Sequence, residues 1–127
     1  MSINSSKKSG KVLIVEHDEF NIRVADSFLY ACGYANVVIA RNGNEALAKF
    51  TNDISFILLN VGLPDCSALD VCKKLRQMPR GKSIPILVFT PRGKGIKTKC
   101  LKAGVNDVMP SPTSFNEFKN ILQRILE

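Results

Sequence analysis

Short, mostly apolar runs alternate along the chain with stretches in which apolar residues recur every three or four positions. The runs typical of buried strands cover residues 11–15, 37–40, 56–60, 85–90 and 105–109. The stretches with helical spacing cover residues 19–32, 44–50, 68–77, 95–103 and 114–126. Gly33 and Gly104 stand where two helices should end, and Ser114 with Glu117 predicts a capping box at the start of the last helix.

Five strands that alternate with five helices predict an α/β fold. Because parallel strands need long crossover connections, the alternation indicates a parallel sheet with right-handed connections and helices on both faces. The pattern fills residues 11–127 without an internal repeat or a second domain, so we expect one domain there. Residues 1–10 are rich in Ser, Lys and Gly and are expected to form a flexible tail.

Composition excludes several classes of protein. No apolar run approaches the roughly 20 residues that a membrane-spanning helix needs, and the polar N-terminus does not resemble a secretory signal. The four cysteines lack CxxC spacing, and the chain has one histidine, so neither a disulfide framework nor a metal site is expected. These features predict a cytoplasmic protein with reduced cysteines and no membrane partner.

Positive charge is concentrated in one part of the chain. The net charge is +7, and residues 73–102 contain ten Lys and Arg and no Asp or Glu. The segment begins within the third predicted helix and continues through the fourth. A basic surface of this kind favours an acidic protein, a nucleic acid or another anion as partner, with a solvated helix face as the plain alternative.

The central apolar run ends abruptly in Asn60, which a turn-rich segment follows. In open α/β sheets, ligands bind beyond the carboxyl ends of the strands, so Asn60 lies where such proteins keep their chemistry. Residues 55–68 resemble the phosphoacceptor segment of response-regulator receiver domains, which take a phosphoryl group from a histidine kinase. In that resemblance Asn60 stands at the phosphoacceptor Asp, Pro64 at a loop Pro and Ala68 at a usual Gly.

The resemblance extends over about residues 11–127 and implies a flavodoxin-like, doubly wound (βα)5 fold with strand order 2-1-3-4-5. It also implies a site of five groups: two acids that help hold magnesium, a nucleophilic Asp, a hydroxyl and a Lys. In this chain the five positions are held by Glu16, His17, Asn60, Thr90 and Ser111.

Three of these five groups are changed. The neutral amide of Asn60 is not expected to form an acyl phosphate, and the imidazole of His17 is a poor magnesium ligand. Ser111 lacks the positive charge with which a lysine would bind a phosphoryl group. We therefore expect no catalytic residue, no magnesium and no other cofactor. Asp18 and Glu19 are the alternative acids. The structural alternatives are that Asn60 hydrogen-bonds loop backbone, that His17 is a polar loop residue, that Thr90 is simply a strand residue and that Pro112 keeps a cis turn.

The sequence thus predicts a degenerate receiver domain that is not an enzyme. It would serve as a phosphorylation-independent module for a signalling protein, such as a histidine kinase or another regulator, with a homodimer as an open alternative. The expected interaction face is basic and comprises Lys94, Lys97, Lys99 and Lys102. The second hypothesis is a polyanion- or nucleic-acid-binding domain that uses residues 73–102. A working phosphoacceptor with another acid is the third.

Overall fold

The structure is a computed structural model that describes residues 10–91, 96–111 and 113–126. Five parallel strands form one sheet in the order β2-β1-β3-β4-β5. The strands are β1 (Lys11–Val15), β2 (Val37–Ala40), β3 (Ile54–Asn60), β4 (Ile86–Pro91) and β5 (Asp107–Ser111). The helices are α1 (Glu19–Ala31), α2 (Gly43–Lys49), α3 (Ala68–Gln77), α4 (Lys97–Lys102) and α5 (Phe115–Leu126), with a short 3-10 helix, η1 (Pro79–Gly81). The predicted flavodoxin-like fold is confirmed.

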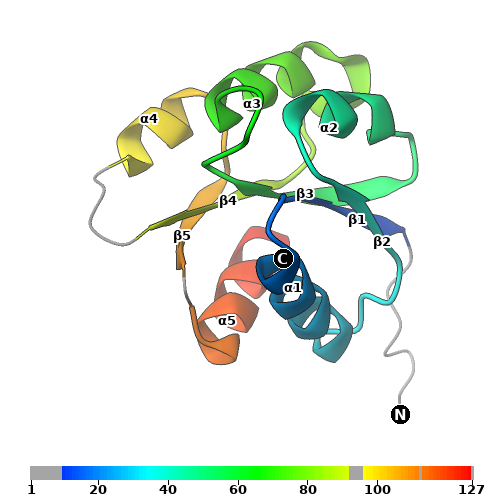
Figure 1. The fold of residues 1–127 in the computed structure, drawn as a ribbon, viewed down its shortest axis with the longest axis vertical. Helices are drawn as coiled ribbons and strands as arrows, with labels where there is room; N and C mark the ends of the chain where they lie inside the picture. The colour runs from blue at the N-terminus through cyan, green and yellow to red at the C-terminus, as the bar shows by residue number, and fades with distance from the viewer. Residues whose placement is uncertain (1–9, 92–95, 112, 127) are drawn as a thin grey trace.

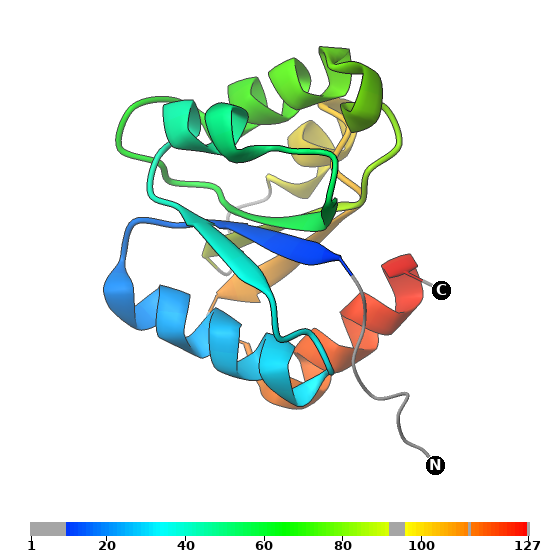
Figure 2. The ribbon, with the colours of Figure 1, turned by 90° about the vertical axis from the view of Figure 1, so that its right-hand side faces the viewer.

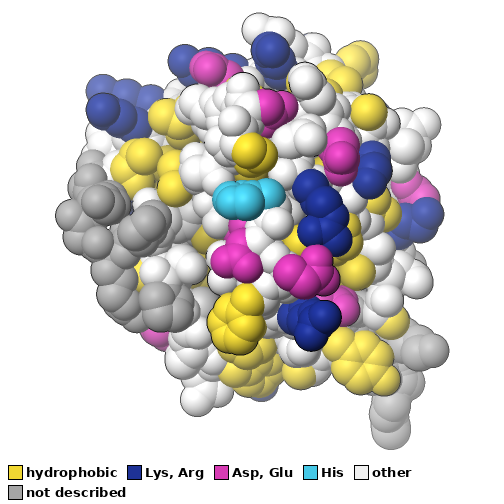
Figure 3. All heavy atoms as spheres, viewed as in Figure 1, with side chains coloured by type: hydrophobic (Ala, Val, Ile, Leu, Met, Phe, Trp, Pro, Cys, Tyr) yellow, Lys and Arg dark blue, Asp and Glu magenta, His cyan; other side chains and the backbone are white. Residues whose placement is uncertain are grey.

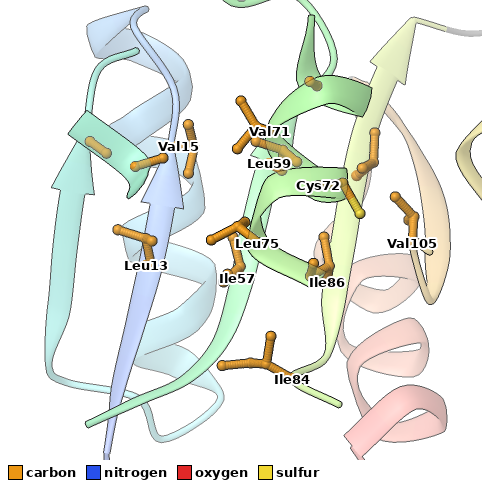
Figure 4. Close-up of a cluster of buried hydrophobic side chains, with 14 of the residues drawn as sticks. Leu13, Val15, Ile57, Leu59, Val71, Cys72, Leu75, Ile84, Ile86 and Val105 are labelled. Atoms are coloured by element: carbon orange, nitrogen blue, oxygen red, sulfur yellow. The ribbon is translucent and has the colours of Figure 1, made fainter. Parts of the chain in front are cut away.

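Helices cover both faces of the sheet (Figures 1 and 2). Helices α2, α3 and α4 lie on one face, and α1 and α5 lie on the other. Successive strand residues point to opposite faces, so the apolar runs of β1, β3 and β4 supply two separate cores. Figure 4 shows the core beneath α3, where Leu75 and Val71 pack over Ile57, Leu59 and neighbouring strand residues. The unbroken apolar runs are therefore explained by burial on both faces.

Local signals at the helix ends act as the sequence predicts. Gly33 and Gly104 adopt positive φ, 98° and 103°, and the next residue in each case donates its N–H to a carbonyl five positions back, closing α1 and α4. Ser114 and Glu117 form the predicted capping box, in which Glu117 N–H donates to Ser114 Oγ at 3.1 Å and Ser114 N–H to Glu117 Oε1 at 3.3 Å.

Several elements begin at other residues than predicted, including β3, which begins at Ile54. Strand β5 begins at Asp107, because the N–H of Val105 completes the turn that ends α4 by donating to Cys100. Helix α4 begins at Lys97, later than expected. Lys94 is predicted to belong to the interaction face, and Pro112 is predicted to keep a cis turn. Both lie outside the described residues.

Arg76 of α3 is an internal connector, although the sequence suggests a surface charge. Its guanidinium donates to the carbonyls of Gly81 (2.7 Å), Ile84 (2.6 Å) and Gly104 (2.7 and 3.0 Å) and to Asn106 Oδ1 (2.9 Å). The same Asn106 oxygen accepts the N–H of Ile86. Arg76 thus ties α3 to the segments that enter β4 and β5, and its charge is not available to a partner.

Candidate functional site

The predicted site residues come together at the carboxyl edge of the sheet. Strand β1 pairs with β3, with Val15 beside Leu59 in the register, so the residues that follow these positions, Glu16 and Asn60, are neighbours. The Glu16 side chain is buried, with the residue only 5% exposed. A buried carboxylate needs hydrogen-bond donors or a cation, and its partners decide what this site can do.

Asn60 supplies one of these donors. Its Nδ2 donates to Glu16 Oε1 at 2.5 Å, and its Oδ1 accepts the N–H of Gly62 at 2.7 Å. The second carboxylate oxygen, Glu16 Oε2, accepts the backbone N–H groups of His17 and Asp18, both at 3.0 Å. Asn60 therefore uses both ends of its amide. The bond to Gly62 is the loop contact that the sequence predicts, and the bond to Glu16 is an additional finding.

The alternative acids are engaged elsewhere. Asp18 caps α1 and accepts the N–H of Phe20 at 3.0 Å. Glu19 pairs with Arg41 at 3.1 Å and with Arg23 at 3.8 Å. Both carboxylates thus have structural partners, which argues against either one as a replacement magnesium ligand.

His17 lies on the surface, with its Nδ1 3.7 Å from Glu16 Oε2. Figure 3 shows the imidazole, in cyan, between hydrophobic and acidic side chains at the centre of this face. Within the described ranges, no group of three or more His, Cys, Asp or Glu side chains is placed to hold a metal. Magnesium prefers several oxygen ligands, and one carboxylate with an imidazole and a committed amide fits that ion poorly.

Thr90 and Ser111 lie at the same edge but in different environments. Thr90 is buried, and its Oγ1 is the one buried side-chain polar atom in the described part of the chain without a hydrogen-bond partner. Ser111 is the last residue of β5, half-buried, and its register partner on β4 is Pro91. Among the described residues, neither hydroxyl contacts Glu16 or Asn60 by a hydrogen bond.

Sequence reasoning missed the residue that fixes the loop after β3. Asp65 accepts the N–H of Gly43 at 2.8 Å and that of Asn44 at 3.0 Å, at the start of α2. These two N–H groups hold the pKa of Asp65 below its usual value. The approach is close, since a Cβ at Gly43 would lie 2.3 Å from Cys66 Sγ. The Gly-Leu-Pro-Asp segment signals a turn, but no local pattern could identify a partner 22 residues earlier.

Residues 12–123 match the family model of the response regulator receiver domain. The chain belongs to this family. It is 32% identical to the chemotaxis protein CheY1 of Helicobacter pylori over 119 residues, which is 91% of this chain and 96% of that protein. This receiver domain is also 31% identical to the two-component response regulator-like protein PRR37 of Oryza sativa, but it spans only 16% of the length of PRR37.

A solved structure supports the same assignment. The receiver domain of the sensor histidine kinase PA1611 from Pseudomonas aeruginosa superposes with a TM-score of 0.81 at 27% identity, covering 94% of this chain and 98% of that one. That structure has a magnesium ion coordinated in its active-site cleft. Receiver domains are in general non-enzymatic modules of two-component signalling that interact with histidine kinases and other signalling proteins. In the described part of this receiver, no helix is long and apolar enough to cross a membrane.

Proposed function

We propose that this receiver domain is an interaction module that works without phosphorylation. The observation that carries the proposal is the hydrogen bond from Asn60 Nδ2 to Glu16 Oε1. A carboxylate attacks phosphorus through an anionic oxygen, whereas Asn60 offers a neutral amide. The amide oxygen already accepts the N–H of Gly62. The position therefore has neither the charge nor the free oxygen of a phosphoacceptor.

The neighbouring positions support the same conclusion. The oxygens of Glu16 already accept three N–H groups, and His17 replaces the second acid. Ser111 ends in a hydroxyl, which cannot supply the positive charge that a lysine would bring to a phosphoryl group. We propose that the domain binds neither magnesium nor a phosphoryl group at this edge.

The surface of α4 is the proposed contact region, and we define the α4 surface as Lys99, Leu101 and Lys102. All three side chains are exposed, and Leu101 is 44% exposed. An exposed apolar side chain on a helix that also carries lysines suits an acidic protein surface, since apolar contacts hold a complex while charges speed encounter. Lys97 adds less positive charge to the contact region, because its ammonium lies 3.8 Å from the carboxylate oxygen Asp107 Oδ1.

A nucleic acid is the second candidate partner, supported by the same lysines. Arg76 is occupied internally, so the positive charge open to a partner is smaller than the sequence suggests. Nucleic-acid binding through lysine–phosphate contacts would weaken steeply as salt is raised, while a complex held by Leu101 would weaken less. The exposed leucine leads us to favour a protein.

A capture experiment tests the proposed function. The domain is immobilised and exposed to native cell extract, with and without nuclease, and with and without acetyl phosphate plus magnesium. We expect one specific partner that survives nuclease and binds equally in both phosphate conditions. The variant Lys99→Glu/Leu101→Ala/Lys102→Glu should lose it, whereas Lys73→Glu/Lys74→Glu, a matched charge change on exposed α3 residues, should keep it. Capture that requires acetyl phosphate would overturn the proposal, and loss on nuclease treatment would favour the nucleic acid.

A further inference from the structure

A cavity of about 90 Å³ lies between α1 and the carboxyl edge of the sheet. Its walls are mainly apolar and include Val24 and Phe28 of α1, Leu58 of β3 and Phe89 of β4. The cavity reaches the surface beside Phe20, which is 72% exposed. An exposed aromatic ring at the rim of an apolar cavity is typical of a binding site for a small, largely apolar ligand.

Among the described residues that line this cavity, one side chain is charged, the buried carboxylate of Glu16. Three N–H groups donate to it. In the described part of the chain, no lysine or arginine lines the cavity or forms an ion pair with Glu16. The imidazole Nδ1 of His17 lies 3.7 Å from Glu16 Oε2. A carboxylate has about four lone-pair sites, and three of those on Glu16 are taken. One acceptor site therefore remains, which suits a single N–H of an ammonium but not magnesium, since magnesium needs several oxygen ligands.

Ser111 and Thr113 also line the cavity. Ser111, half-buried at the end of β5, contributes only a short side chain to the wall. Most of the described lining residues are apolar, and the polar ones are Glu16, Asn21, Ser111 and Thr113. A water needs about 10–15 Å³ of such volume, so 90 Å³ admits a chain of roughly five non-hydrogen atoms.

We propose that this cavity binds a primary alkylammonium of about four carbons. The ammonium would lie against Glu16 and the alkyl chain against Val24, Phe28 and Leu58. The butylammonium group occurs both in free aliphatic amines and at the end of a lysine side chain, and the two sources are separated experimentally below. The proposed amine site and the proposed function both involve Glu16. The amine site is tested by chemical shifts on adding an amine, whereas the proposed function is tested by capture of a partner with and without acetyl phosphate. Either proposal can therefore fail without the other.

The test is an NMR titration of the full chain at pH 7 and constant ionic strength. We expect n-butylamine to cause saturable shifts of the methyl groups of Val24, Ala25 and Leu58, with a dissociation constant of about 1–10 mM, in the range open to so small a ligand. Butan-1-ol, which lacks the charge, should bind at least about ten times more weakly, and butyrate should cause no such shifts. Equal binding of amine and alcohol would overturn the proposal.

Variants and a lysine probe sharpen the result. Ser111→Leu should fill the cavity and abolish binding, while Thr98→Leu, on the exposed side of α4, should leave it unchanged. Glu16→Gln should remove the preference for amine over alcohol. Unchanged amine affinity in a folded Ser111→Leu would also refute the site. The probe Nα-acetyl-lysine methylamide separates the two sources of the ligand. If it binds as tightly as butylamine, the natural ligand is a lysine side chain of a peptide, and if it binds more weakly, the natural ligand is a free amine.

Discussion

Asn60 and Glu16 are joined by a hydrogen bond of 2.5 Å between side chains 44 residues apart, on neighbouring strands of the sheet. Two carboxylates at this separation would repel each other, and one would have to gain a proton or a cation. The Asn60 amide supplies a hydrogen-bond donor to Glu16, so neither an added proton nor a cation is needed. We therefore infer that an amide at this position stabilises the edge of the sheet without a metal.

Replacing Asn60 with Asp should destabilise the domain. Asn60→Asp leaves Glu16 Oε1 without its donor and places a second negative charge beside it. We therefore expect the free energy of unfolding to fall by about 1–3 kcal/mol in EDTA at pH 8. Millimolar magnesium should restore part of this loss, while the parent protein should be insensitive to magnesium. Urea denaturation with and without magnesium measures both effects. Asn120→Asp, on the exposed side of α5, is the matched control, and equal stability of the two variants would contradict the interpretation.

Arg76 should be one of the most sensitive polar residues of the domain. Arg76→Met removes hydrogen bonds to three backbone carbonyls and to Asn106, and we expect a loss of about 2–4 kcal/mol in the free energy of unfolding. Arg76→Lys should recover little of it, because an ammonium cannot reach acceptors spread around a planar guanidinium.

Chemical denaturation of these variants beside Lys73→Met measures the difference. Lys73 is exposed on the same helix, and its replacement should change stability by less than about 0.5 kcal/mol. A loss for Arg76→Met as small as that of the control would show that the hydrogen bonds are replaced by water at no cost.

The carboxylate of Asp107 should make stability depend on pH in the acid range. Burial alone would raise its pKa, but the Arg124 guanidinium at 2.6 Å and the N–H of Val108 hold the pKa of Asp107 below its usual value. A carboxyl with a lowered pKa stabilises the fold above its unfolded pKa, and this contribution is lost as pH falls through the folded pKa.

Arg124→Met should therefore lower the free energy of unfolding by about 1 kcal/mol near neutral pH. The expected effect is this small because the arginine is largely exposed, so solvent screens the ion pair. The difference from the parent protein should shrink below about pH 4, where Asp107 becomes protonated in the unfolded chain. Denaturation midpoints measured from pH 3 to pH 7 provide the test. A difference that stays constant over this range would exclude the ion pair as its cause.

The sequence predicts most of the fold because its signals are local. Apolar runs mark β1, β3 and β4, and Gly33 and Gly104 mark two helix ends through the positive φ that they adopt. The start of β5 could not be predicted, since it depends on Val105 donating its N–H to the preceding helix. The position of Asn60 at the site was predictable from the strand pattern and the family resemblance.

The partners of site residues were not predictable, because they come from distant parts of the chain. The bond from Asn60 to Glu16 depends on the pairing of β1 with β3. The bonds from Gly43 and Asn44 to Asp65 depend on the packing of α2 beside the loop after β3. Arg76 is read from the sequence as a surface charge, and only the three-dimensional structure reveals its acceptors.

The central claim is that this receiver domain does not take up a phosphoryl group. Its most direct test is a titration of the ¹⁵N-labelled protein with beryllofluoride and magnesium, followed by amide NMR, since beryllofluoride binds as a phosphoryl mimic only where a carboxylate receives it. We predict no saturable shifts at Glu16, Asn60 or Gly62, and no added mass after incubation with acetyl phosphate and magnesium. Saturable shifts centred on Asn60, or a stable adduct of phosphoryl mass, would contradict the account.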